Sequence, residues 1–210
     1  MILEAGAALL LAAAPGAVSS PDRGPPGHAP PGAARSMVRS AGASVRLAVP
    51  AVRQSPERCG PAALGMVLRF YGAGPEALAE ADRAYDRALR GALITDLAAA
   101  ARRAGYAAEV VMLPPDSLAA WLARGVPPIV LYQSGVGPLA RPHYAVVVGW
   151  DAERHRWTLN DGGAAARAVD AAEFSRRYRG SNDRALIVRP GPAVTPAGAG
   201  VASAAKGPPQ

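Results

Sequence analysis

The chain contains a single cysteine, Cys59, and its sequence context is that of a nucleophile. It stands directly before an apolar segment in which Pro61 occupies a position where the first turn of a helix tolerates a missing backbone N–H. The thiol is therefore predicted at a helix N-terminus, where the dipole and unpaired N–H groups stabilise a thiolate and lower the thiol pKa. Gly60 is expected to keep the approach to the sulfur open. The alternative is a buried structural cysteine.

A cysteine nucleophile needs a base, and the three histidines differ in where they stand. His28 belongs to a segment rich in proline and glycine, and His155 falls in a predicted hairpin turn. His143 alone stands well inside the domain, just after Pro142 and at the start of the predicted strand YAVVVGW. If a histidine activates Cys59, His143 is the candidate, because the other two lie outside regular structure. A purely structural role for His143 is the alternative.

The hairpin that follows His143 returns two polar side chains towards it. Its second strand ends in Asn160 and Asp161, and either could accept a hydrogen bond from the imidazole. An ideal ladder that pairs the tryptophans of the two strands places Asn160 opposite Val147, on the face of His143, with Asp161 facing away. One β-bulge reverses this assignment, so both residues stay candidates.

Together these segments resemble the bacteriocin-processing, or double-glycine, peptidase family of the papain-like cysteine peptidases. The resemblance is carried by Gln54, by CGPAAL starting at Cys59, and by the segments PHYAVVVGWD and LND. It spans residues 45–189 and is nearer to stand-alone members, some of them exported, than to domains fused to peptide-exporting ABC transporters. It implies a papain-like fold and, as the family suggests, cleavage of leader peptides of the double-glycine type.

The resemblance also implies roles for individual residues. Cys59 becomes the nucleophile, His143 the general base and acid, and Asp161 the orienting acid, whereas Gln54 and the Cys59 N–H form the oxyanion hole. Two departures are visible: Gly162 follows Asp161 where the family often has proline, and the interval from Gln54 to Cys59 is a residue shorter than in transporter-fused members. These departures bear on substrate preference more than on the reaction.

Three functions fit the same residues. The first is hydrolysis of a peptide or protein substrate by a Cys-His-Asp triad. The second is a papain-like amidase or acyltransferase acting on a non-peptide amide, and the third is a non-catalytic peptide-binding module. The sequence has no Walker-type loop, G-x-x-x-x-G-K, so a transporter or membrane partner would bring its own ATPase as a separate polypeptide.

Composition argues against several other classes of protein. The net charge of +7 comes from arginines scattered singly or in pairs, without a basic run, so nucleic-acid binding is not predicted. One cysteine excludes an intramolecular disulfide framework and a multi-cysteine metal site. No cofactor is expected.

The ends of the chain differ from its middle. Residues 1–20 resemble a signal peptide, although Glu4 stands where a basic residue is usual, which predicts export to the periplasm or beyond; a cytoplasmic apolar extension is the alternative. Residues 21–43 and 190–210 are rich in proline and glycine and are predicted to be a disordered linker and tail. The peptidase domain is expected at residues 44–189.

Within that domain, helices come first and a mostly antiparallel sheet follows, which predicts an α+β fold. Helices are expected from Cys59 to Gly72, at Pro75–Leu89, from an N-cap at Thr95 to Gly105, at Ser117–Arg124 and at Ala171–Tyr178. Strands are expected at Val45–Val49, Ala107–Leu113, Pro128–Tyr132, Tyr144–Trp150, Arg156–Asn160 and Ala185–Arg189.

Overall fold

The computed structural model describes residues 43–135 and 137–192. The predicted signal peptide, nearly all of the predicted linker and most of the predicted tail lie outside the described residues. Every helix and strand of the described part falls between Val45 and Arg189. No helix in this part is long and apolar enough to span a membrane.

Seven antiparallel strands form one sheet in the order β2-β7-β3-β4-β5-β6, and β1 pairs with β4. The strands are β1 (Val45–Arg46), β2 (Ala107–Met112), β3 (Ile129–Ser134), β4 (Arg141–Asp151), β5 (Arg156–Asn160), β6 (Arg167–Asp170) and β7 (Arg184–Arg189). The middle of β4 is fully buried on both faces, since Ala145, Val146 and Val147 are each 0% exposed. Strand β6 was not predicted from the sequence, and only two residues of the predicted first strand form β1.

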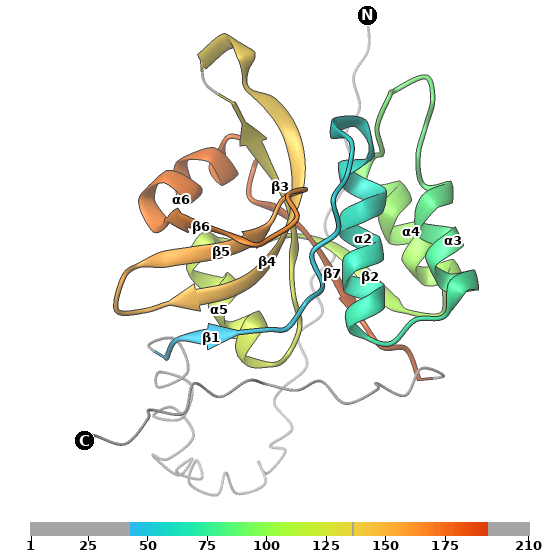
Figure 1. The fold of residues 1–210 in the computed structure, drawn as a ribbon, viewed down its shortest axis with the longest axis horizontal. Helices are drawn as coiled ribbons and strands as arrows, with labels where there is room; N and C mark the ends of the chain where they lie inside the picture. The colour runs from blue at the N-terminus through green and yellow to red at the C-terminus, as the bar shows by residue number, and fades with distance from the viewer. Residues whose placement is uncertain (1–42, 136, 193–210) are drawn as a thin grey trace, which may run out of the picture. The chain divides into compact units, whose positions relative to one another are not determined.

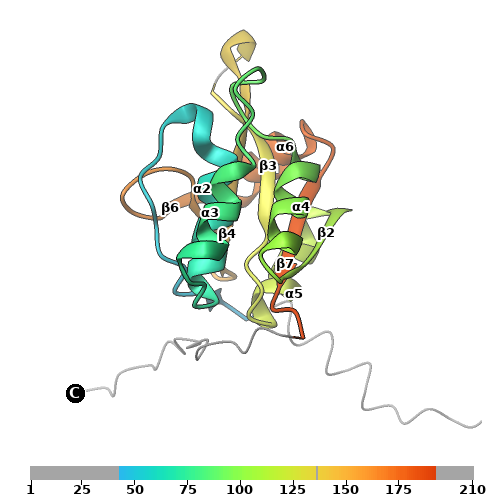
Figure 2. The ribbon, with the colours of Figure 1, turned by 90° about the vertical axis from the view of Figure 1, so that its right-hand side faces the viewer.

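Helices cover both faces of this sheet. They are η1 (Pro56–Arg58), α2 (Cys59–Phe70), α3 (Pro75–Arg83), α4 (Ile94–Arg103), α5 (Pro115–Ala123), η2 (Gly137–Leu139) and α6 (Ala171–Arg179). Figure 1 shows α2, α3 and α4 on one side of the sheet and α5 and α6 on the other, and the turned view in Figure 2 agrees. The predicted α+β fold is confirmed.

Helix α2 packs closely against the sheet because of the glycine in its first turn. A Cβ atom at Gly60 would stand 3.1 Å from Ala92 Cβ, 3.2 Å from Leu97 Cδ1 and 3.2 Å from Tyr144 Cδ2. The glycine therefore lets the start of α2 approach β4 and α4. This close packing is a structural reason for the glycine, and the expectation that Gly60 keeps the approach to the sulfur open stays a prediction.

The predicted helix over Pro75–Leu89 is too long, since α3 ends at Arg83. The Asp86 carboxylate accepts hydrogen bonds from the main-chain N–H groups of Ala88 and Leu89 at 2.7 and 3.0 Å, and this local bonding competes with a continued helix. Residues 84–93 form a loop instead. The helix predicted to be capped by Thr95 begins at Ile94, which places Thr95 in its first turn.

Candidate active site

Cys59 is the first residue of α2, as predicted, and is 8% exposed. Burial raises the pKa of its thiol, but interactions with the His143 side chain and with the main-chain N–H groups of Tyr144 and Gly60 outweigh burial and bring the pKa below its ordinary value. The buried cysteine thus stands in surroundings that favour the thiolate, which is the reactive form.

His143 lies on β4 and connects the thiol with the turn after β5. Its Nε2 atom lies 2.9 Å from the main-chain carbonyl oxygen of Asp161. A carbonyl only accepts hydrogen bonds, so Nε2 carries the proton and Nδ1 is left for the thiol. Burial lowers the pKa of His143, yet its bonds with Cys59 and the Asp161 carbonyl raise it overall. The two opposite shifts favour a thiolate–imidazolium pair.

A β-bulge decides which side of β5 faces His143. Trp150 pairs with Trp157, as the ideal ladder assumed, but the register shifts between Val147 and Gly149. Asn160 consequently lies opposite Val146, on the other face from His143, and the expectation that it lies opposite Val147 is wrong.

The amide of Asn160 has a structural partner. Its Nδ2 atom donates to the main-chain carbonyl of Val49 at 3.0 Å, and the residue is 2% exposed. In this structure, therefore, the next residue, Asp161, makes the contact with His143.

Asp161 contacts the imidazole through its main chain, while its carboxylate has other partners. Arg167 donates to Oδ2 from Nε at 2.9 Å and from Nη2 at 2.7 Å, and the Tyr132 hydroxyl donates to the same oxygen at 3.2 Å. Tyr132 lies opposite His143 in the sheet, and their rings pack edge to face with centroids 5.8 Å apart. Neither partner of the Asp161 carboxylate was predicted from the sequence. Tyr132 has the pattern of a core aromatic residue, and Arg167 belongs to β6, which was not predicted.

Gln54 lies against the turn that follows Asp161. Its main-chain N–H donates to the Gly162 carbonyl at 3.4 Å, and its side-chain amide packs on Gly162. Both amide atoms of Gln54 are buried and have no hydrogen-bond partner among the described residues. Buried amides are rarely left in this state, which fits a group that awaits a ligand.

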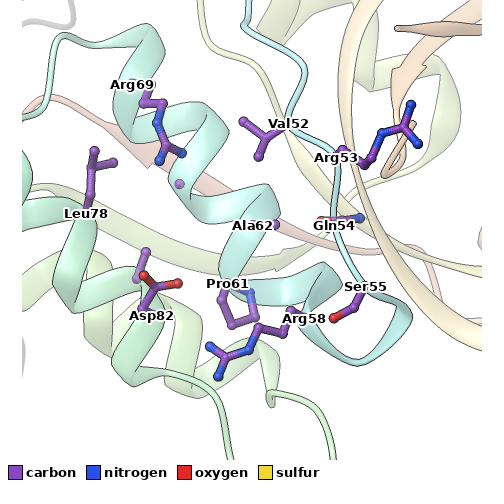
Figure 3. Close-up of a pocket in the computed structure, with 12 residues that line it drawn as sticks. Val52, Arg53, Gln54, Ser55, Arg58, Pro61, Ala62, Arg69, Leu78 and Asp82 are labelled. Atoms are coloured by element: carbon purple, nitrogen blue, oxygen red, sulfur yellow. The ribbon is translucent and has the colours of Figure 1, made fainter. Parts of the chain in front are cut away.

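The segment that carries Gln54 also borders a pocket of about 250 Å³ between this segment, α2 and α3. Figure 3 shows this pocket, with Arg58, Arg69 and Asp82 around it. Neither Cys59 nor His143 lines it. Gln54 itself lines the pocket, but the candidate nucleophile and base lie outside it.

A cleft runs past the Cys59 and His143 side chains. Cys59 lines a cavity of about 610 Å³ and His143 lines one of about 570 Å³, and the two share several lining residues. The shared residues are Glu57, Leu89, Arg90 and Pro142. Loop 84–93 and the β3–β4 hairpin thus form two walls of the cleft. Glu57, two residues before Cys59, forms an ion pair with Arg90 of the loop.

The described residues hold no cluster of His, Cys, Asp and Glu suited to a metal ion.

The family model of the peptidase C39 family matches residues 49–192. A double glycine motif protease from an AMS/PCAT transporter, solved with its leader peptide, is 24% identical with a TM-score of 0.55, covering 70% of this chain and 94% of that one. The peptidase domain of Streptococcus ComA, a bi-functional ABC transporter of a quorum-sensing pathway, is 20% identical with a TM-score of 0.54, covering 68% and 98%.

A C39-like peptidase from Bacillus anthracis is 14% identical with a TM-score of 0.58, covering 70% of this chain and 98% of that one. At these identities the three likenesses show a shared fold. A comparison with curated protein sequences found no match.

Proposed function

This chain belongs to the peptidase C39 family and is a peptidase, and we propose that it uses Cys59 as nucleophile, His143 as general base and acid, and Asp161 to orient the imidazole. The observation that carries the proposal is the chain of contacts from the Cys59 thiol through His143 to the Asp161 carbonyl. It joins a nucleophile, a base and an orienting group, which is the arrangement that activates a cysteine.

The reaction follows from these contacts. Nδ1 of His143 takes the thiol proton, and the Cys59 thiolate attacks the carbonyl carbon of the scissile peptide bond. The imidazolium then protonates the departing amine, which leaves a thioester on Cys59, and water activated by His143 hydrolyses that thioester. Atoms balance over the cycle, since one water is consumed and two peptide termini are released.

The oxyanion needs donors, and two groups are proposed for that role. The main-chain N–H of Cys59 lies in the first turn of α2, where N–H groups have no acceptor within the helix. The Gln54 amide is buried, without a partner among the described residues, and adjoins the turn that holds His143. A preorganised donor in a site that excludes water stabilises the charge that develops in the transition state.

For the substrate we propose peptides with a leader of the double-glycine type. The proposal is supported by the family and by the fold shared with a protease solved with such a leader peptide. We propose a transporter or another membrane protein as a partner. We propose export on the basis of the apolar segment at residues 2–14.

The test is cleavage of a proteome-derived peptide library, with mass spectrometry of the products from wild type and from Cys59→Ala. New peptide ends that require Cys59 are expected, and each new C-terminal carboxylate should carry one oxygen from ¹⁸O-labelled water. Transfer of the acyl group to an added amine in place of water would identify an acyltransferase. A folded wild type that releases nothing beyond Cys59→Ala would contradict the proposed peptidase mechanism.

A further inference from the structure

The Asp161 carboxylate is bound by other side chains, while the main chain of the same residue contacts the His143 imidazole. Arg167 donates two hydrogen bonds to Oδ2 of Asp161, and the Tyr132 hydroxyl donates a third to the same oxygen. The side chain of Asp161 is 16% exposed. Nε2 of His143 meets the main-chain oxygen of the same residue. The negative charge at this position is thus matched by a guanidinium, and a neutral carbonyl faces the imidazole.

We propose that Arg167 is a positioning residue of this active site, and that it acts with Tyr132. Arg167 holds the Asp161 carboxylate away from His143 so that the main-chain carbonyl of Asp161 accepts the Nε2 hydrogen. The inference rests on the proposed function, because it assigns His143 the role of base. It differs from a triad in which the carboxylate itself orients the imidazole.

The chemistry of the three partners supports this role. Burial and the charge of Asp161 raise the pKa of Tyr132 to about 12, so its hydroxyl stays protonated and donates to the carboxylate. The Arg167 guanidinium is a permanent cation with a fixed fork of donors. A carbonyl orients the imidazole and selects its tautomer, but it stabilises the imidazolium less than an adjacent free carboxylate would.

Other titratable and charged groups near His143 also affect how its imidazole titrates with pH. The titratable and charged residues that interact with it or line its cavity are Cys59 of α2, Tyr132 of β3, Asp161 after β5, and Glu57, Arg90 and Arg141 along the cleft. Arg167 of β6 lies one contact further away, on the Asp161 carboxylate. Both carboxylates in this set are paired with an arginine, Asp161 with Arg167 and Glu57 with Arg90. Removal of Arg167 alone should therefore unmask one negative charge close to the imidazole.

The first test is Asp161→Asn, which retains the main-chain carbonyl and removes the charge. We expect kcat/KM to fall by less than about tenfold, because the asparagine amide oxygen can still accept from Arg167 and the main-chain contact with His143 is kept. Where a carboxylate orients the imidazole itself, as in the serine-protease triad, the same change costs about 10⁴-fold in kcat. A loss of that size in a folded variant would overturn the proposal.

The second test is the pKa of His143, measured by NMR titration of the imidazole in Arg167→Gln. We expect it to rise, since the unpaired Asp161 carboxylate stabilises the imidazolium. Adding Asp161→Asn should cancel the rise, and Arg167→Lys, which keeps the cation, should stay near wild type. The matched control is Arg154→Gln, which breaks the ion pair with Asp151 in the β4–β5 turn and should leave the titration unchanged.

The two measurements separate this proposal from the proposed function. The NMR titration needs no substrate, so a raised pKa of His143 in Arg167→Gln would stand even if library cleavage did not depend on Cys59. If Cys59 proves essential while His143 titrates alike in wild type, Arg167→Gln and Arg167→Lys, the function stands and the positioning role of Arg167 is wrong. Circular dichroism of each variant confirms that it is folded.

Discussion

Gly162 lies so close to Gln54 that a Cβ atom at position 162 would stand 2.7 Å from Gln54 Nε2 and 2.9 Å from its Cγ. The backbone of Gly162 also has φ of +103°, a conformation that side chains rarely adopt. The turn that presents the Asp161 carbonyl to His143 is therefore also the surface on which the proposed oxyanion donor rests. Glycine after Asp161, where the family often has proline, meets both demands.

Gly162→Ala is expected to displace the Gln54 amide and to lower kcat by at least about tenfold, because added atoms inside a packed contact force neighbours to move. Gly125→Ala is the matched control, since Gly125 also has positive φ, at +75°, but nothing lies within 4 Å of a Cβ built there. Both variants should lose stability, and only Gly162→Ala should lose kcat beyond that loss. Equal kinetics in the two variants would contradict this account.

Gln54→Ala tests the oxyanion donor directly. Loss of one such donor typically costs about 10²–10³-fold in kcat, and we expect a residual rate from the main-chain N–H of Cys59. Steady-state kinetics on a cleavable peptide should show the loss mainly in kcat, because the donor acts in the transition state. Full activity in Gln54→Ala would assign the buried amide to another role.

The Cys59 thiol is expected to react with iodoacetamide well below its ordinary pKa of about 8.5. His143 contributes to the lowered pKa of the thiol, whereas burial raises it, so His143→Ala should move the midpoint of labelling to higher pH. Mass spectrometry assigns the product without ambiguity, since the chain has one cysteine. An unreactive thiol at pH 8, or a midpoint that His143→Ala leaves in place, would favour the peptide-binding module.

The two glycines of α2 should respond to alanine with opposite signs. Gly60→Ala meets three nearby side chains within 3.2 Å and should destabilise the fold by about 1–3 kcal/mol, which is typical of overpacking. Gly65→Ala meets only the flexible end of Arg69 and should stabilise it by about 0.5–1 kcal/mol, since alanine is the better helix former. Urea unfolding of the two variants provides the comparison, and two changes of the same sign would refute it.

Asn160→Ala separates the two neighbouring candidates for the orienting residue. The change leaves the buried Val49 carbonyl without its donor and should cost about 1–3 kcal/mol of unfolding free energy. The His143 titration should stay as in wild type, because Asn160 lies on the other face of β5. A shifted titration with unchanged stability would return Asn160 to the active site.

Local patterns were sufficient for much of the fold. The apolar spacing after Cys59 and the proline in the first turn predicted α2. The apolar run YAVVVGW and the following segment RWTLN predicted the β4–β5 hairpin, in which Trp150 pairs with Trp157. These features arise from residues within a turn or a strand of one another, so the sequence contains them directly. Loop 84–93 and β6 were not predicted. In the loop, the Asp86 carboxylate binds main-chain N–H groups and so competes with a continued helix. Strand β6 is a short edge strand with two exposed residues before Val169, so it lacks a clear apolar pattern.

The sequence by itself pointed to the proposed nucleophile and the proposed base, because it holds one cysteine, placed before a helix, and one histidine at the start of a strand inside the domain. Tertiary structure decided how that base is oriented. A single bulge between Val147 and Gly149 turned Asn160 towards Val49 and Asp161 towards His143. Arg167 and Tyr132, which are distant from each other in the chain, both donate hydrogen bonds to the Asp161 carboxylate. Side-chain direction in a strand reverses with each residue, so register is a property of the paired strands, and no single strand encodes it.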